Sequence, residues 1–93
     1  MKTKNRNKLR YLLSSHKAFL DEYLSGISQE IDERIEEFFF QLDFALKVRV
    51  KHEKMLIRNI FVSHIDFLET VMVNEVEREE LKGFTLLIRD FIK

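Results

Sequence analysis

The chain has no cysteine, no proline and no tryptophan, and only two glycines among its 93 residues. Without cysteine it can form no disulfide, no thiol nucleophile and no cysteine-based zinc site, and we expect a reducing, cytoplasmic compartment. Proline and glycine interrupt helices, whereas Leu, Glu, Lys and Arg, which are abundant here, lose little side-chain freedom in them. The composition therefore predicts an all-α fold.

Long apolar runs are also absent, because 34% of the residues are charged. Uncharged stretches such as residues 59–65 fall far short of the roughly 20 residues that a membrane span needs. No apolar segment follows the basic N-terminus, so we expect no secretory signal. A core built from so short a chain is marginal, and self-association is a common remedy. We expect one soluble helical domain that forms a homodimer and has no membrane partner.

Helical periodicity starts at Lys8. In the first segment the apolar positions alternate steps of four and three residues, as a coiled-coil seam does. Gly26 is placed to end this segment and Ser28 to cap the next, while Gly83 ends a third. The predicted helices span residues 8–25, 28–50, 54–81 and 84–92. We expect residues 1–7 to be a mobile basic arm and residues 8–93 to be a single helical domain.

The four predicted helices are expected to form an antiparallel bundle of three long helices and one short C-terminal helix. Residues 48–54 keep no clear apolar stripe, yet they contain neither glycine nor proline. Helices two and three are therefore either separate or fused into one long helix, and the sequence leaves both arrangements open.

Charge is segregated along the chain although the net charge is zero. Residues 1–17 hold six bases and no acid, and residues 21–43 hold eight acids against one base. Residues 47–58 hold five bases against one acid, and residues 66–80 hold six acids against one base. In an up-down-up arrangement the basic segments come together at one end of the bundle and the acidic segments at the other. The sequence therefore predicts a basic pole and an acidic pole. An antiparallel homodimer or a charged partner would compensate these poles.

The basic pole offers an alternative function, because nucleic-acid affinity comes largely from neutralised phosphates. The near-neutral pI of about 6.8 and the lack of a nucleic-acid-binding motif keep this second to protein binding. The candidate nucleic-acid-binding residues are Lys2, Lys4, Arg6, Lys8, Arg10, Lys47, Arg49, Lys51, Lys54 and Arg58.

Three consecutive phenylalanines, residues 38–40, cannot share one buried face, because they span about 200° of a helix. Phe40 and Phe44 form a second apolar stripe, and Phe67 and Val73 lie off the main stripe of the third helix. Exposed apolar ridges usually mark contact surfaces. We therefore predict Phe40, Phe44, Phe67 and Val73 as protein-binding residues; the alternative places helix two inside the bundle, packed on two sides.

Residues 28–38 have the sequence SQEIDERIEEF. This segment resembles the SQELD signature of the Spo0E-like aspartyl-phosphate phosphatases, small helical hairpins that act on sporulation response regulators. The resemblance implies contacts with a regulator's active site through Gln29, Glu30 and Asp32. The same residue types are also typical of an ordinary capped, acidic first turn of a helix.

Arg58 and His64 fit the pattern of an arginine, a polar residue and a later histidine that HEPN-type ribonucleases carry. The resemblance implies that these two side chains meet across a dimer cleft and cleave RNA. The apolar residues between and after them, Ile60, Phe61 and Ile65, explain the same stretch as helix core.

The three histidines, His16, His52 and His64, lack the spacing of metal ligands. No glycine-rich phosphate loop or nucleophile motif is found, and we expect no metal and no cofactor. His16 and His64 lie on apolar faces, where core or interface histidines are common. The sequence therefore predicts a small non-catalytic interaction or regulatory protein that acts by protein–protein binding and self-association. The alternatives are nucleic-acid binding through the basic pole and an enzyme of the phosphatase or ribonuclease type.

Overall fold

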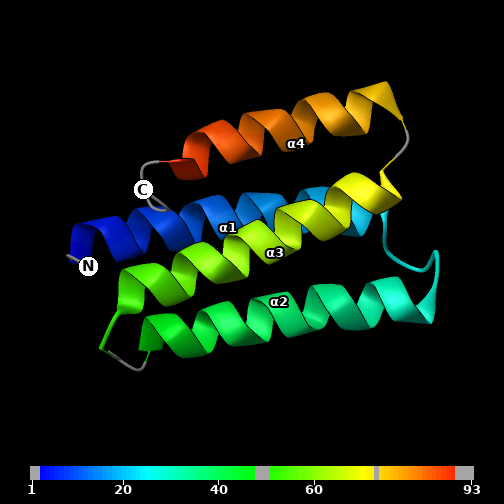
Figure 1. The fold of residues 1–93 in the computed structure, drawn as a ribbon. Coiled ribbons are helices and arrows are strands. Elements are labelled where there is room, and N and C mark those ends of the chain that lie inside the picture. The colour runs from blue at the N-terminus through cyan, green and yellow to red at the C-terminus, as the bar shows by residue number, and fades with distance from the viewer. Residues whose placement is uncertain (1–2, 48–50, 73, 90–93) are drawn as a thin grey trace.

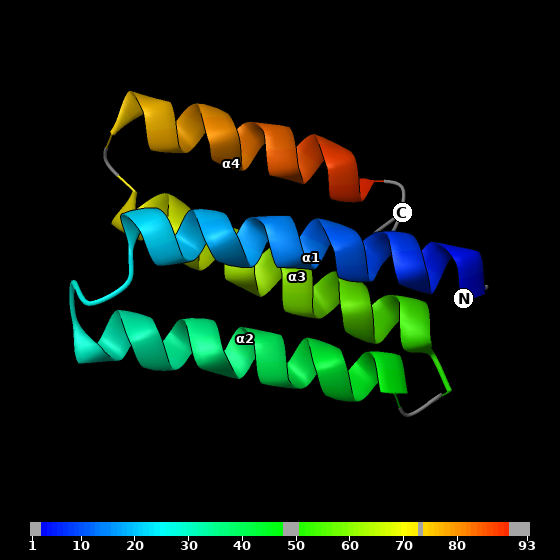
Figure 2. The same ribbon diagram turned by 180° about the vertical axis from the view of Figure 1, so that it is seen from behind.

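The computed structural model describes residues 3–47, 51–72 and 74–89. Within these ranges the chain forms four helices, α1 (Thr3–Tyr23), α2 (Gln29–Lys47), α3 (Glu53–Val71) and α4 (Glu75–Ile88), and no strand. The predicted all-α class is confirmed. The helices lie side by side along the longest dimension, and successive helices run in opposite directions (Figures 1 and 2). No helix in these ranges combines the length and apolar character needed to cross a membrane.

A single apolar core holds the four helices together. α2 packs on α3, α1 packs on α4, and α4 also contacts α3. Each helix contributes an apolar face, and leucines dominate the buried positions, followed by phenylalanines and isoleucines. The largest fully enclosed side chains are Leu9, Leu20, Leu24, Leu42, Ile57, Phe61, Leu68, Met72 and Ile88.

The first helix begins earlier than the sequence predicts. α1 starts at Thr3, so residues 3–7 belong to the helix, and the boundary expected at residue 8 is wrong. Arg6 is the reason: this residue is only 6% exposed, and its side chain donates to the Leu46 carbonyl at the end of α2 and pairs with Glu53 at the start of α3. A buried ion pair between distant segments leaves no trace in apolar periodicity.

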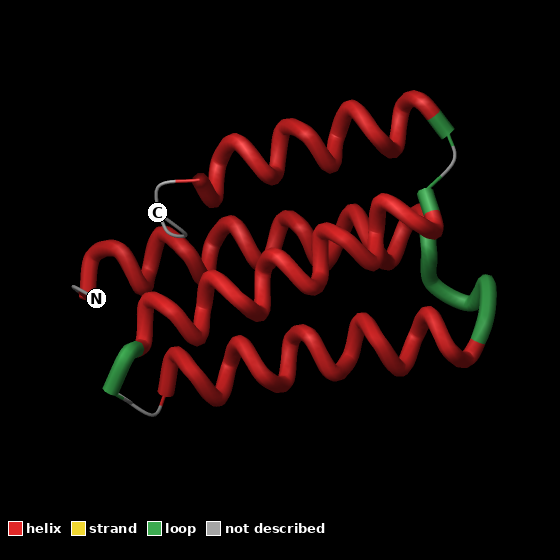
Figure 3. Tube along the Cα trace, in the orientation of Figure 1, coloured by secondary structure: helices red, strands yellow, loops and turns green. Residues whose placement is uncertain are grey.

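Helices two and three are separate, so the fused alternative is wrong. α2 ends at Lys47 and α3 begins at Glu53, and the tube in Figure 3 shows α3 running back beside α2. His52, just before α3, has a left-handed backbone with φ of +65°. Histidine tolerates this region better than branched residues do, so the chain turns here without glycine.

The largest correction concerns the third and fourth helices. The predicted helix over 54–81 ends instead at Val71, and α4 runs through Gly83 to Ile88. Asn74 starts α4 as its N-cap, because its side-chain oxygen accepts the Val76 N–H at 2.8 Å. The result is three helices of 19 to 21 residues and a fourth of 14, rather than three long helices and a short terminal one.

Candidate functional site

The outer face of α2 carries two exposed phenylalanines. Phe38 is buried and Phe39 half-buried, whereas Phe40 is 73% exposed and Phe44, one turn further on, is 52% exposed. Steps of 100° along the helix cause this sequence of exposures. α2 lies at the edge of the molecule in both ribbon views (Figures 1 and 2). The alternative in which helix two is packed on two sides is therefore wrong for the single chain.

The polar neighbours of these two rings bond to one another along α2. Lys47 Nζ lies 2.8 Å from Asp43 Oδ2, and Gln41 Nε2 donates to Glu37 Oε1 at 3.1 Å. These are exposed contacts between residues one turn apart, which stabilise a helix slightly. The two phenyl rings are the part of this face for which folding of the single chain supplies no cover.

The other two predicted contact residues do not join this surface. Phe67 is half-buried against the core, and the Arg34 guanidinium lies over its ring, 4.6 Å from the centroid. Together with Ser63 and His64 these two residues line a groove of about 260 Å³ between α2 and α3. Val73 lies outside the described residues. The structure thus brings Phe40 and Phe44 together and sets Phe67 apart from them.

A buried pair of histidines forms the most unusual feature of the core. His16 of α1 and His64 of α3 meet with 2.8 Å between their Nε2 atoms. The His16 ring stacks on Phe84 of α4 with centroids 3.7 Å apart, and the His64 ring stacks on Phe38 of α2 with centroids 3.5 Å apart. All four helices therefore meet at this pair. The sequence places both histidines on apolar helix faces, but no sequence pattern indicates that they touch.

Both histidines are held neutral by their surroundings. Burial lowers the pKa of His16 to about 3, and burial together with the nearby His16 lowers the pKa of His64 to about 2. One ring must then donate and the other accept. His16 Nδ1 is buried without a partner among the described residues, and an orphaned acceptor costs less than an orphaned donor. We assign the shared proton to His16 Nε2, with His64 Nε2 accepting.

Such a pair is a poor acid–base catalyst. General acids and bases work best when their pKa lies near the operating pH, and these values lie several units below neutrality. Arg58 is exposed and sits six positions from buried His64, about 120° around α3. The arginine and histidine of the ribonuclease-like pattern therefore do not share a surface within one chain.

The SQEID segment, residues 28–32, consists of Ser28 and the first turn of α2. Ser28 Oγ accepts the Ile31 N–H at 3.1 Å, as the predicted N-cap should. Asp32 Oδ1 accepts the N–H of Gly26 at 3.2 Å, where Gly26 has a φ of +79°. Gln29 and Glu30 are exposed. Ser28 and Asp32 thus have local structural roles that account for their presence in the motif.

The basic residues gather at one end of the molecule. α1 begins, α2 ends and α3 begins at that end, while α1 ends and α4 begins at the other (Figure 1). Arg6 is buried and does not belong to the basic surface, and Lys2 and Arg49 lie outside the described residues. The exposed members are Lys4, Lys8, Arg10, Lys47, Lys51, Lys54 and Arg58.

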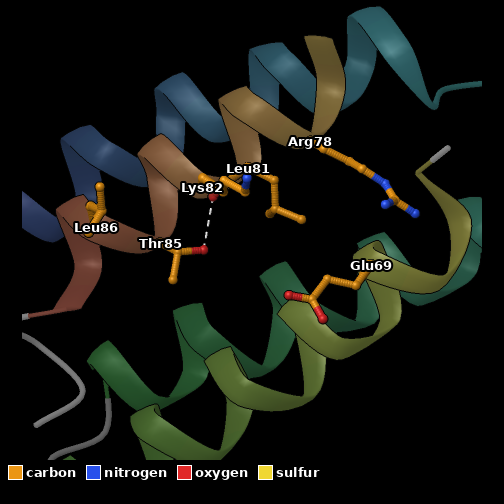
Figure 4. Close-up of a pocket in the computed structure, with 6 residues that line it drawn as sticks. All are labelled: Glu69, Arg78, Leu81, Lys82, Thr85 and Leu86. Atoms are coloured by element: carbon orange, nitrogen blue, oxygen red, sulfur yellow. Dashed lines mark hydrogen bonds between the residues drawn. The ribbon is translucent and has the colours of Figure 1, made fainter. Parts of the chain in front are cut away.

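A cleft of about 580 Å³ opens between α3 and α4 (Figure 4). Glu69 and Arg78 project into the gap from opposite helices, and Leu81 and Thr85 form its α4 wall. Thr85 Oγ1 donates to the Leu81 carbonyl at 2.8 Å, so the hydroxyl is already used by the helix. Among the residues that the structure describes, no three His, Asp or Glu side chains lie close enough to hold a metal ion. The cleft therefore shows no catalytic constellation in the described chain.

Comparison with protein-family models, with curated proteins and with solved structures finds no match for this chain.

Proposed function

We propose that this protein is a non-catalytic interaction or regulatory protein that binds another protein chain through the outer face of α2. The antiparallel four-helix bundle is then a scaffold that presents this face. The exposure of Phe40 and Phe44 carries the proposal. Exposed aromatic side chains on adjacent turns of an edge helix usually mark a protein contact.

The charged residues on either side of the two rings indicate which charges the partner should carry. Acidic side chains precede Phe40 along α2 and Lys47 follows Phe44. A helix with one apolar stripe binds in the groove of a partner or along another helix. The partner therefore needs an apolar strip with bases at one end and acids at the other.

Photo-crosslinking tests this proposal directly. A photoreactive amino acid placed at position 44 should capture a protein when the chain is expressed in its native cells. The same amino acid at position 11 is the control, because Tyr11 is an aromatic residue on α1 that is even more exposed than Phe44, at 74% against 52%. Capture at position 44 and not at 11 supports the proposal; equal capture at both, or none at 44, contradicts it.

Nucleic-acid binding is a second candidate, favoured by the exposed bases that α1, α2 and α3 bring to one end of the molecule. Phosphate-driven binding weakens steeply as salt rises. A gel shift with duplex and single-stranded probes at low and moderate salt tests it, with Lys4→Gln and Lys8→Gln expected to weaken any complex. Because neither lysine lies on the outer face of α2, these variants should leave crosslinking at position 44 unchanged.

A further inference from the structure

The outer face of α2 and the turn that follows it carry charges in a symmetrical order. The charged positions are separated from the two aromatic rings, and from one another, by alternate steps of three and four residues. Those on the N-terminal side of the rings are acids, and those on the C-terminal side are lysines. Such steps keep side chains on one seam of a helix. All members are exposed. In chain order they are Glu33, Glu37, Phe40, Phe44, Lys47 and Lys51.

This order is self-complementary when a second α2 lies antiparallel to the first. If Phe40 faces Phe44 of the second copy, residues whose numbers add up to 84 (40 plus 44) face each other. Glu37 then faces Lys47 of the second copy, because 37 plus 47 is also 84. Glu33 extends the acidic side of the seam by one turn, and Lys51 lies in the turn before α3, outside the helical register. One register therefore matches both the apolar and the charged positions.

We propose that two copies of this chain pair through the outer faces of α2, antiparallel and related by a two-fold axis between Phe40 and Phe44. This rests on the proposed function and names the partner as a second copy. A two-fold contact is closed, so it gives a dimer and no larger assembly. Antiparallel pairing also sets the positive end of each helix dipole beside the negative end of the other.

The same residues disfavour the other possible arrangements of two α2 helices. A parallel pair in register would oppose Glu37 to Glu37 and Lys47 to Lys47, and like charges across a seam repel. An antiparallel pair shifted by one heptad would set charged side chains against the phenyl rings. Two helices of 19 residues form an interface at the small end of the standard range. We therefore expect a dimer that dissociates in the micromolar range.

Charge exchange across the seam is the sharpest test, by sedimentation equilibrium. Glu37→Lys alone places lysine opposite Lys47 twice in a symmetric dimer, and Lys47→Glu alone places glutamate opposite Glu37 twice. Each variant should associate at least about tenfold more weakly than the wild type. An equimolar mixture of the two variants should recover wild-type association, because both seam pairs again combine one base with one acid. Recovery in the mixture shows that charge weakened the single variants. The weakening itself distinguishes the antiparallel register, because in a parallel pair each single variant would oppose like charges just as the wild type does.

Matched controls separate this contact from general charge effects. Lys82→Glu reverses an equally exposed lysine, which pairs with Glu79 on α4, and Tyr11→Asp removes an exposed aromatic ring from α1. Both should associate as the wild type does, and circular dichroism should show every variant to be equally helical. A wild type that stays monomeric to about millimolar concentration, or single variants that associate as tightly as the wild type, overturns the antiparallel pairing. Crosslinking at position 44 to a different protein would then leave the proposed function standing, whereas no crosslink would end both.

Discussion

The two glycines of this chain lie in opposite backbone environments. Gly83 sits inside α4 with ordinary helical geometry, and a Cβ added there would meet nothing within 4 Å. Glycine in a helix interior costs about 0.5–1 kcal/mol relative to alanine. Gly83→Ala should therefore raise the free energy of unfolding by that amount and the melting temperature by roughly 2–8 °C. A thermal melt followed by circular dichroism measures it.

Gly26 provides the control for that substitution. A Cβ at Gly26 also has free space, but its φ of +79° lies in the left-handed region that side chains disfavour. Gly26→Ala should lower stability by about 1–2 kcal/mol. If Gly83→Ala lowered stability as Gly26→Ala does, the continuous α4 helix through residue 83 would be contradicted.

Arg6 is a second residue whose role is set by contacts that the sequence does not reveal. Its guanidinium connects the last turn of α2, at the Leu46 carbonyl, with Glu53 in the first turn of α3. Both side chains of the ion pair are nearly inaccessible. Arg6→Met leaves the Glu53 carboxylate without this partner, and breaking a buried pair costs about 3–5 kcal/mol.

Urea denaturation checks the prediction. Arg6→Met with Glu53→Met removes both charges and should recover much of the loss, while Lys8→Met, an exposed lysine on α1, should change stability by less than about 0.5 kcal/mol. An Arg6→Met variant as stable as Lys8→Met would mean that Arg6 behaves as part of a free arm.

At the scale of helices, the sequence predicted elements better than their ends. The turn between α1 and α2 was predictable, because glycine and a capping serine stand together at residues 26 and 28. The end of α3 was not, because it falls inside an apolar run, at Val71, and the next residue, Met72, is completely buried. Gly83 misled the prediction, since a glycine that ends one helix looks the same in sequence as one inside another.

Asn74 distinguishes the observed break from the continuous helix that the sequence suggested. In the structure its side chain caps α4, and replacing a cap by alanine costs about 1 kcal/mol. In a continuous helix over 54–81, alanine would be a better residue than asparagine. Asn74→Ala should therefore destabilise the protein in urea denaturation, and Asn74→Asp, which keeps a capping oxygen, should not. A stabilising Asn74→Ala would support one unbroken helix.

At the scale of the whole molecule, surface features were easier to predict than the polar contact in the core. The spacing of Phe40 and Phe44 places them opposite the buried face of α2, and helix geometry alone gives that result. The contact between His16 and His64 joins positions 48 residues apart. It depends on how α1, α2, α3 and α4 pack together, which no local pattern encodes.

That contact makes the stability of the whole molecule sensitive to acid. In the unfolded chain each histidine takes up a proton near pH 6.5, whereas in the folded core the pKa of His16 is about 3 and that of His64 about 2. Between pH 6.5 and about 3 the unfolded state binds more protons, so stability falls as the pH falls. The slope reaches about 1.4 kcal/mol per pH unit for each histidine.

Lowering the pH from 7 to 4.5 should therefore reduce the free energy of unfolding by about 5 kcal/mol through these two histidines. This loss is similar to the whole stability of a small domain. Urea denaturation across this range measures it.

The double variant His16→Leu/His64→Leu removes both polar partners at once and leaves neither unpaired. Its stability should fall much less between pH 6 and pH 4.5. His52→Asn removes the exposed third histidine, keeps a residue that tolerates positive φ, and should retain the wild-type slope. Equal slopes for all three proteins would show that the buried pair does not control the acid response.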